Sequence, residues 1–202
     1  MVDIIITTYK TEDYLNMLLE SLLPNKLINK VIISDGEKKE IKIVESVINN
    51  TKVIRLFDNK RKYFSENCNT GFKFVTSEYF ILMNSDTRVS DPNWLNILLK
   101  TQGENSNYGI LSPWGVFYDE PKLTNKTIVE EQTHIGAFCW FMKSELFRRL
   151  NGLRTDGDYI HWNSDFDFCD RVYKEGLKVG WAPTTISHKG GGNGQPTDIK
   201  RF

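Results

Sequence analysis

The sequence predicts an α/β fold in which helices flank a mostly parallel central sheet. Three observations predict it. Short β-branched runs alternate with segments of helical spacing over roughly the first ninety residues. These runs are continuously apolar, as strands covered on both faces are. Each run is followed by a polar, turn-forming tetrapeptide, where a parallel strand would end.

Four strands and three connecting segments account for the first half. The strands are expected at 2–7, 30–34, 52–57 and 79–83. The connections 11–23 and 37–50 each carry an apolar stripe with helical spacing, and Pro24 ends the first one. The third connection, 66–76, is expected to be a less regular helix because Gly71 lowers its helix propensity.

The second half has fewer regular signals, so we expect a mixed arrangement there. A helix is expected at 90–100, where Asp91 suits the N-cap and Pro92 the first turn. Further strands are expected at 108–114, 136–143 and 178–183, with helices at 144–152 and 164–176. The Gly-rich residues 189–202 are expected to form a flexible tail.

Composition excludes several classes of protein. Lys plus Arg and Asp plus Glu both number 26, so the chain lacks the basic excess of a nucleic-acid-binding protein. The cysteines at 68, 139 and 169 form no CxxC pair, which predicts reduced thiols in a cytoplasmic protein. No segment approaches the roughly 20 apolar residues of a membrane helix, and the first apolar run is too short for a signal peptide. We therefore expect a soluble protein whose only membrane contact would be peripheral.

Polar residues gather at one edge of the predicted sheet. The strand ends carry TTYK at 7–10, SDGE at 34–37, DNKR at 58–61 and NSDT at 84–87. Parallel α/β sheets bind ligands at the carboxyl ends of their strands, so Thr8, Asp35 and Asp86 should share one edge. No GxGxxG follows the first strand and no GxxxxGK[ST] occurs, which argues against dinucleotide and P-loop sites.

Five titratable residues could serve chemistry, although none forms a motif alone: Asp35, Asp86, Asp165, Asp167 and His188. Together they could bind a hard divalent cation such as Mg²⁺ or Mn²⁺ and still leave a carboxylate that is not a metal ligand. Each also has a structural interpretation. Asp86 could end a strand, Asp165 and Asp167 could favour a helix dipole, and His188 could be a surface histidine.

The order of the segments resembles the GT-A glycosyltransferases of family 2. The segments are IIITTYK, VIISDGE, ENCNTGF, YFILMNSDTRV, IGAFCWFMKSELFRRLNGL, NSDFDFCDRVYKEG and VGWAPTTISHKGGG, and NSDT favours the rhamnosyltransferase-like branch. The resemblance implies one GT-A domain over 1–202 with a Rossmann-like sheet. Its nucleotide-binding half would be 1–90 and its metal and acceptor half 91–188, before the tail at 189–202.

The resemblance also implies roles for individual positions. The donor-binding residues would be Thr7, Thr8, Tyr9, Asp35, Arg61, Asn69, Asn84, Ser85 and Asp86. Asp86 and His188 would hold Mn²⁺ or Mg²⁺ at the donor diphosphate, and Asp165 would be the general base that deprotonates the acceptor hydroxyl. The residues near the sugar or acceptor would be Gly136, Ala137, Trp162 and Asp167.

The implied function is metal-dependent, inverting transfer of one sugar, hexosyl or rhamnosyl, from a nucleotide-diphosphate sugar. The acceptor would be a glycan, a lipid-linked saccharide or another hydroxyl compound. A metal would stabilise the charge on the leaving diphosphate while a base activates the nucleophile. Three positions depart from the family pattern: Asn84 replaces the first acid of DxD, Ser164 replaces Glu, and Tyr63 replaces a common Gly.

Two alternatives to a glycosyltransferase stay open. One is a sugar nucleotidyltransferase, although TTYKTEDY, after the first strand, lacks the Gly-rich basic loop usual there. The other is a catalytically decayed carbohydrate-binding module, which Asn84 and Ser164 motivate.

Overall fold

The computed structural model of the protein describes residues 1–89, 91–116, 125–160 and 163–189. One mixed sheet forms its centre, in the order β3-β2-β1-β4-β8-β6-β9-β5, with β7 paired to β9. The strands are β1 (Val2–Thr8), β2 (Ile28–Asp35), β3 (Val53–Leu56), β4 (Tyr79–Asn84), β5 (Thr87–Val89), β6 (Tyr108–Val116), β7 (Glu130–Gln132), β8 (Cys139–Lys143) and β9 (Lys178–His188). The first four are parallel, whereas β8 is antiparallel to β4, so the predicted parallel half and mixed half are confirmed.

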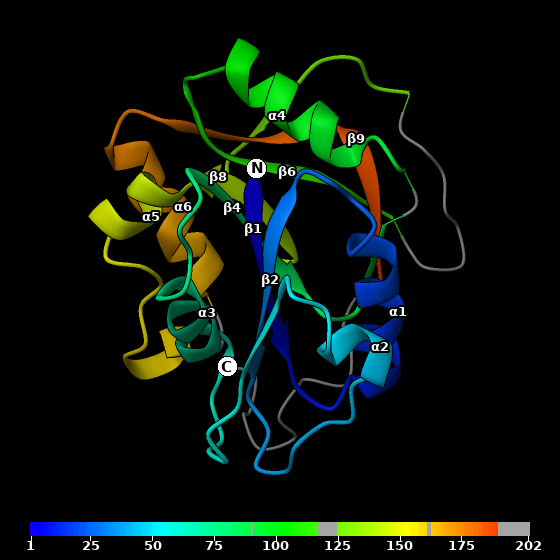
Figure 1. Cartoon of the computed structure of the whole chain (residues 1–202). Helices are drawn as coiled ribbons and strands as arrows, with labels where there is room; N and C mark the ends of the chain where they lie inside the picture. Colours follow the sequence, from blue (N-terminus) through cyan, green and yellow to red (C-terminus); the bar gives the residue numbers. More distant parts are fainter. Residues whose placement is uncertain (90, 117–124, 161–162, 190–202) are drawn as a thin grey trace.

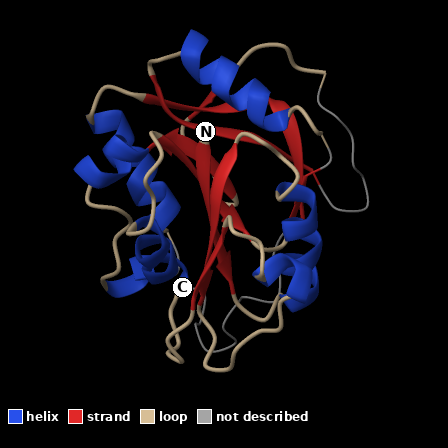
Figure 2. Ribbon diagram, in the orientation of Figure 1, coloured by secondary structure: helices blue, strands red, loops and turns tan. Residues whose placement is uncertain are grey.

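Helices cover both faces of this sheet, which confirms the predicted α/β class (Figures 1 and 2). They are α1 (Glu12–Leu22), α2 (Glu45–Ile48), α3 (Phe64–Phe72), α4 (Trp94–Glu104), α5 (Ser144–Arg149), the 3-10 helix η1 (Gly157–Ile160) and α6 (Ser164–Lys174). α1, α2 and α4 contribute to one buried cluster, and α3, α5 and α6 to a second on the other face. Within the described residues, no helix has the length and apolar character that crossing a bilayer requires.

The side chains of β1 show how the two layers form. Ile4 and Ile6 pack into the cluster with α1, while Ile5 points into the cluster with α3. A Cβ at Gly71 would lie 2.5 Å from the Ile5 Cγ2 atom. Gly71 therefore allows α3 to approach β1 closely, and α3 is a regular helix despite its low propensity there. All three cysteines are free, in line with the expected reduced thiols, and all three are buried.

The prediction of a helix over 37–50 is wrong, because only the single turn of α2 is helical there. The segment before α2 has no regular secondary structure and is bound to α1. The Asn16 side chain donates to the Lys42 carbonyl (3.2 Å) and accepts the Val44 N–H (3.0 Å). Val44 is consequently 45% exposed, although helical spacing had placed it on an apolar stripe.

Other elements also differ from expectation. α4 begins at Trp94, with Asn93 and not Asp91 at the N-cap position, and the Asp91 carboxylate accepts the Asn93 N–H (2.8 Å) in the preceding turn. β5 and β7 were not expected, and β9 extends to His188. β5 and β7 are short segments that pair with β9, so sequence pattern alone did not reveal them. Trp162 and residues 190–202 of the expected tail lie outside the described residues.

Candidate active site

The carboxylate of Asp86 and the imidazole of His188 meet at the end of the sheet. Asp86 follows β4 and directly precedes β5, whose Thr87 lies opposite His188 in the antiparallel register with β9. The Asn84 carbonyl accepts the Thr87 hydroxyl (2.8 Å), which fixes the turn between β4 and β5. As a result, His188 Nε2 lies 3.2 Å from Asp86 Oδ1.

Phe138 fixes both sides of this pair. Its ring stacks on the imidazole of His188, with centroids 5.0 Å apart and 15° between the planes. Its backbone carbonyl accepts the Asn84 N–H (2.9 Å), two residues before Asp86. A Cβ at Gly115 would lie 2.9 Å from Phe138 Cζ, so the ring is also confined from β6. Sequence reasoning did not single out Phe138, whose role depends on contacts distant in the chain.

The chemistry of these two side chains fits a divalent cation that shares its coordination with a ligand. Neighbouring donors on an octahedral ion with bonds of about 2.1 Å lie about 3 Å apart. The 3.2 Å between Asp86 Oδ1 and His188 Nε2 matches that separation. Within the described residues, no group of three or more His, Cys, Asp or Glu could hold a metal ion. A cation here would therefore need further oxygen donors, as a diphosphate and water provide.

A row of hydroxyl groups connects the ends of β1 and β4. The Thr8 and Thr11 hydroxyls lie 3.0 Å apart, and the Thr11 and Ser85 hydroxyls lie 2.5 Å apart. Thr7 pairs with Asn84 in the parallel register of β1 and β4. The structure thus brings Thr7, Thr8, Asn84 and Ser85 to one edge, as predicted. Thr11 is an additional member that the strand-end pattern did not indicate.

Asp35 is at the same edge and is fully buried. Its carboxylate accepts the Glu37 N–H (3.0 Å) and lies 3.5 Å from the Arg55 guanidinium. Burial raises the pKa of Asp35, although hydrogen bonds from Glu37 and Ile41 and the charge of Arg55 oppose this shift. Arg55 was not expected at the site, because its position within a strand suggested no role.

Arg61 closes over Tyr9 beside Asp35. Its guanidinium carbon lies 3.3 Å from the centroid of the Tyr9 ring and 5.0 Å from that of Tyr63. It also donates to the Gly36 carbonyl (3.3 Å), next to Asp35. Tyr63, which stands where the family commonly has Gly, thus occupies space near the predicted donor residues.

Asn69 does not join this group. Its amide donates to the Leu153 carbonyl (2.7 Å), and its oxygen accepts the Leu153 N–H (2.9 Å). By contrast, Asn67, two residues earlier in α3, bonds to Ser34 near the strand ends. Positions two apart lie about 200° around a helix, so Asn69 points away from that edge.

Asp165 lies in the first turn of α6, against the loop before β8. Its carboxylate accepts the Phe166 N–H (3.0 Å). Burial raises the pKa of Asp165, against the opposing effect of backbone N–H groups, including that of Ala137, and of the nearby His134. Gly136 is exposed beside Ala137 and has open space where a side chain would be. The structure therefore brings Asp165, Gly136 and Ala137 together.

Asp167 has a different environment from Asp165. Its carboxylate lies 2.7 Å from Arg171 and 3.6 Å from Arg154. These ion pairs lie on another side of α6 from Asp165, because the two acids are two positions apart in the helix. The structure thus does not bring Asp167 to Ala137, and Trp162 lies outside the described residues.

The two parts of the site meet at consecutive residues. Ala137 directs its N–H toward Asp165, while Phe138 stacks on His188. Adjacent Cα atoms are about 3.8 Å apart, so an acid and a possible cation site both contact one short segment.

Comparison with known proteins agrees with this architecture. Residues 3–166 match the model of the family "Glycosyl transferase family 2". A search of curated proteins gave no match. Among solved structures, S. aureus TarS 1–349 in complex with UDP-GlcNAc is similar with a TM-score of 0.74 and 15% identity, over 98% of this chain and 61% of that one.

Two further structures have the same fold. The mannosyltransferase PcManGT from Pyrobaculum calidifontis, in complex with GDP-Man and Mn²⁺, has a TM-score of 0.71 and 16% identity, over 93% of this chain and 56% of that one. GalNAc-T7 with UDP, GalNAc and Mn²⁺ has a TM-score of 0.77 and 13% identity, over 100% of this chain and 46% of that one. This chain thus spans less than two thirds of each of these proteins. The fold is that of GT-A glycosyltransferases, and since the family model matches most of the sequence, the chain belongs to glycosyl transferase family 2.

Proposed function

We propose that the protein transfers one sugar from a nucleotide-diphosphate sugar to a glycan, a lipid-linked saccharide or another hydroxyl acceptor, with inversion and with Mn²⁺ or Mg²⁺ as cofactor. The observation that carries the proposal is that Asp165 and the Asp86–His188 pair contact consecutive residues, Ala137 and Phe138. An inverting displacement needs a base on the nucleophile side and charge stabilisation on the leaving-group side.

On the donor side, Asp86 and His188 would hold the cation, which when bound stabilises the charge that develops on the leaving diphosphate. Thr7, Thr8, Asn84 and Ser85 would position the donor from the strand ends, with Asp35, Tyr9 and Arg61 around the nucleotide. TarS and PcManGT are seen with UDP-GlcNAc and GDP-Man, which supports a nucleotide-diphosphate donor. The NSDT sequence motivates a rhamnosyl or hexosyl group.

On the acceptor side, Asp165 would take the proton of the attacking hydroxyl. Its raised pKa makes the carboxylate a stronger base than an exposed aspartate, while the Phe166 N–H holds one oxygen in place. Gly136 and Ala137 would leave space for the acceptor next to this carboxylate. Asp167 would act on the acceptor only through the ion pairs that hold α6.

Calorimetric titration of UDP, GDP and dTDP with and without Mn²⁺ tests the donor side. We expect at least one of them to bind more tightly with Mn²⁺, and Asp86→Asn and His188→Ala to remove that difference. Absence of Mn²⁺-dependent binding for all three nucleotides would contradict the proposal.

A second pair of variants tests the proposed base. Asp165→Asn should abolish sugar transfer and leave nucleotide binding within about twofold, because Asp165 contacts Phe166, Ala137 and His134 and, among the described residues, no predicted donor residue. Glu175→Gln, at the other end of α6, is the matched control and should keep activity. Turnover retained by Asp165→Asn would exclude Asp165 as the base.

Asn84 and Ser164 also keep a decayed, carbohydrate-binding function open. Slow Mn²⁺-dependent hydrolysis of a nucleotide sugar by the wild-type protein would support an enzyme. Glycan binding without any hydrolysis or transfer would instead support the binding module.

A further inference from the structure

Two tryptophans on neighbouring strands lie beside each other and have no role in the site described above. Trp114 belongs to β6 and Trp181 to β9, and their ring centroids lie 5.7 Å apart with 31° between the planes. Both residues are half-buried. Trp181 packs against the buried cluster with α3, α5 and α6, whereas Trp114 packs, among the described residues, against neither buried cluster. Packing of the core therefore explains Trp181 but does not explain Trp114.

An exposed ion pair accompanies the two rings. The Lys126 ammonium lies 5.5 Å from the centroid of the Trp114 ring and 3.1 Å from the Glu130 carboxylate. Glu130 stands opposite Trp181 in the antiparallel register of β7 and β9, so their side chains share one face. The side chains of Lys126 and Glu130 are 48% and 43% exposed. Trp114, Lys126, Glu130 and Trp181 thus form one group, which we call the Trp114 cluster.

Phe138 joins the Trp114 cluster to the candidate active site. The centroid of its ring lies 5.9 Å from that of Trp181 and 5.0 Å from that of His188. Aromatic rings therefore follow one another from the proposed cation ligand His188 to Trp114. A ligand bound at the cluster would lie next to the candidate active site.

The chemistry of the cluster combines aromatic faces with hydrogen-bonding groups. The C–H faces of a pyranose ring pack on aromatic rings, and its hydroxyls bond to carboxylates and ammonium groups. A cationic ligand fits less well, because the Lys126 ammonium already lies over the Trp114 ring. An anionic ligand also fits less well, because Glu130 balances the charge of Lys126. A neutral saccharide matches the cluster best.

We propose that the Trp114 cluster binds a pyranose saccharide, with one sugar face on the Trp114 indole and hydroxyls at Lys126 and Glu130. Because Phe138 connects the cluster to His188, this saccharide would be part of the acceptor. That assignment rests on the proposed function, and it selects a glycan among the acceptors considered there. Binding at the cluster does not itself require a donor or a cation, so it can be measured without either.

The indole N–H signals of the full ¹⁵N-labelled chain test the proposal. The probes are maltopentaose and cellopentaose, titrated without nucleotide or divalent cation. With at least one of them we expect the signals of Trp114 and Trp181 to shift. Those of Trp94 and Trp140 should stay unchanged, because these residues are 1% and 0% exposed. Sorbitol at an equal concentration of hydroxyl groups has no ring and should shift none of the four.

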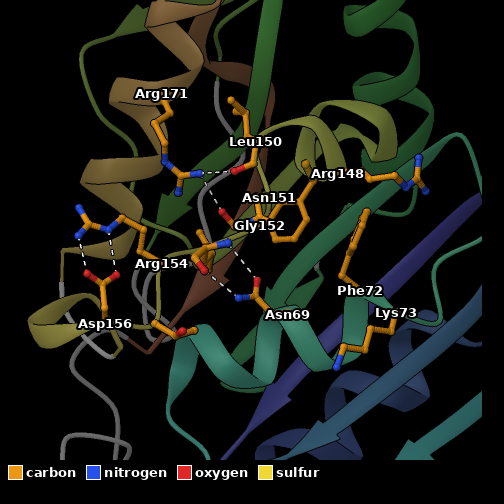
Figure 3. A pocket seen from close by; sticks show the side chains of 13 residues that line it. Asn69, Phe72, Lys73, Arg148, Leu150, Asn151, Gly152, Arg154, Asp156 and Arg171 are labelled. Atoms are coloured by element: carbon orange, nitrogen blue, oxygen red, sulfur yellow. Dashed lines mark hydrogen bonds and ion pairs between the residues drawn. The ribbon is translucent and has the colours of Figure 1, made fainter.

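The hollow of about 520 Å³ beside α3, α5 and α6 provides an internal control for non-specific binding (Figure 3). Its polar groups bind one another. Arg171 donates to the Leu150 carbonyl (2.6 Å), and Arg154 makes a two-point contact with Asp156, at 3.0 and 2.6 Å. We therefore expect the backbone amide signals of residues 150–156 to stay unchanged. Shifts there as large as those at the Trp114 cluster would indicate non-specific binding and would overturn the proposal.

Variants at Trp114 identify the stacking ring. Trp114→Ala should weaken binding of the pentasaccharide by about 10-fold or more, because the aromatic face is lost. Trp114→Tyr keeps such a face and should bind within about fivefold of wild type. Phe74→Ala removes a ring that is 41% exposed elsewhere and is the control, expected within about twofold. Unchanged Trp94 and Trp140 signals would show that each variant is folded.

Three results would each overturn the saccharide site: no indole shift with either pentasaccharide, equal weakening in Trp114→Ala and Phe74→Ala, or equal weakening in Trp114→Ala and Trp114→Tyr. Binding of nucleotides with and without Mn²⁺ is measured separately and tests the transferase function. Failure of the saccharide site can thus be distinguished from failure of the proposed function.

Discussion

The ring of Phe138 lies parallel to the imidazole of His188, with 5.0 Å between the centroids, while its backbone carbonyl bonds to Asn84. One residue thus contacts both segments that carry the proposed cation ligands. Ligands held in this way need little reordering when an ion arrives, so the affinity for the ion should depend on Phe138.

Phe138→Ala should therefore weaken Mn²⁺ binding by about 10- to 100-fold, because loss of a group that orients a ligand has effects of this size. The affinity is measured by electron paramagnetic resonance titration of free Mn²⁺ in the presence of UDP. Phe166→Ala removes a half-exposed ring away from His188 and is the control. An unchanged Mn²⁺ affinity in folded Phe138→Ala would show that the stacking has no such role.

Gly115 limits where the Phe138 ring can lie. A Cβ there would be 2.9 Å from Phe138 Cζ, so Gly115→Ala should lower the free energy of unfolding by about 1–3 kcal/mol through overpacking. Gly103, in α4, has no atom within 4 Å of a Cβ, and Gly103→Ala should instead raise it by about 0.5–1 kcal/mol. Urea denaturation of both variants measures the two effects. Equal changes would mean that the contact with Phe138 carries no cost.

Gly152 combines a left-handed backbone with a close contact. Its φ is +67°, and a Cβ would lie 2.5 Å from the Asn69 Oδ1 atom. Gly157 has a similar φ of +55° but open space around a Cβ. Gly157→Ala should cost about 1–2 kcal/mol from backbone strain alone, and Gly152→Ala about 1–3 kcal/mol more. Thermal and urea denaturation would show this order, and the reverse order would contradict it.

Asp3, which is buried, and Asp165, which is partly buried, should affect stability with opposite dependence on pH. Burial alone would raise the pKa of Asp3, but hydrogen bonds from Thr76, Ser77 and Asn29 lower it below its ordinary value. Asp3 therefore contributes stability above its unfolded pKa, and this is lost as pH falls through the folded pKa. Asp3→Asn should cost about 1–3 kcal/mol at neutral pH and less in acid, because buried donors lose their acceptor.

Asp165 should show the opposite trend. Burial raises its pKa above the ordinary value, so the charged carboxylate destabilises the fold above the folded pKa, and this cost disappears as pH falls below the unfolded pKa. Asp165→Asn should therefore be more favourable, relative to wild type, at about pH 7 than at about pH 3.5. Urea denaturation at both pH values measures the trend for both variants. The same direction for Asp3→Asn and Asp165→Asn would contradict the assigned environments.

The first half of the fold could be predicted because its signals are local. Continuous apolar runs mark β1 to β4, and parallel pairing brings Thr8, Asp35 and the end of β4 to one edge. The error over 37–50 is explained by Asn16, whose side chain bonds to the backbone of Lys42 and Val44. The spacing of apolar residues within 37–50 contains no information about this contact with α1.

The second half of the site depends on contacts that no local pattern carries. The proximity of His188 to Asp86 follows from the pairing of β5 with β9, and β5 was not expected from its three residues. Phe138 likewise acquires its position from Gly115 and His188, which lie on two other strands. The ordered resemblance implies that Asp86, Asp165 and His188 share one site, whereas the contacts that position Asp86 and His188 could be identified only from the structure.

The turn after β4 is tied to its neighbours through the main chain of Asn84, whose N–H reaches Phe138 and whose carbonyl accepts Thr87. A different side chain at this position would leave both bonds intact. Evolution could thus exchange an acid for an amide here without disturbing the shape of the loop, and mutagenesis could reverse the exchange as easily. The side chain at position 84 can therefore change the polar groups at this edge while the backbone of the turn stays the same.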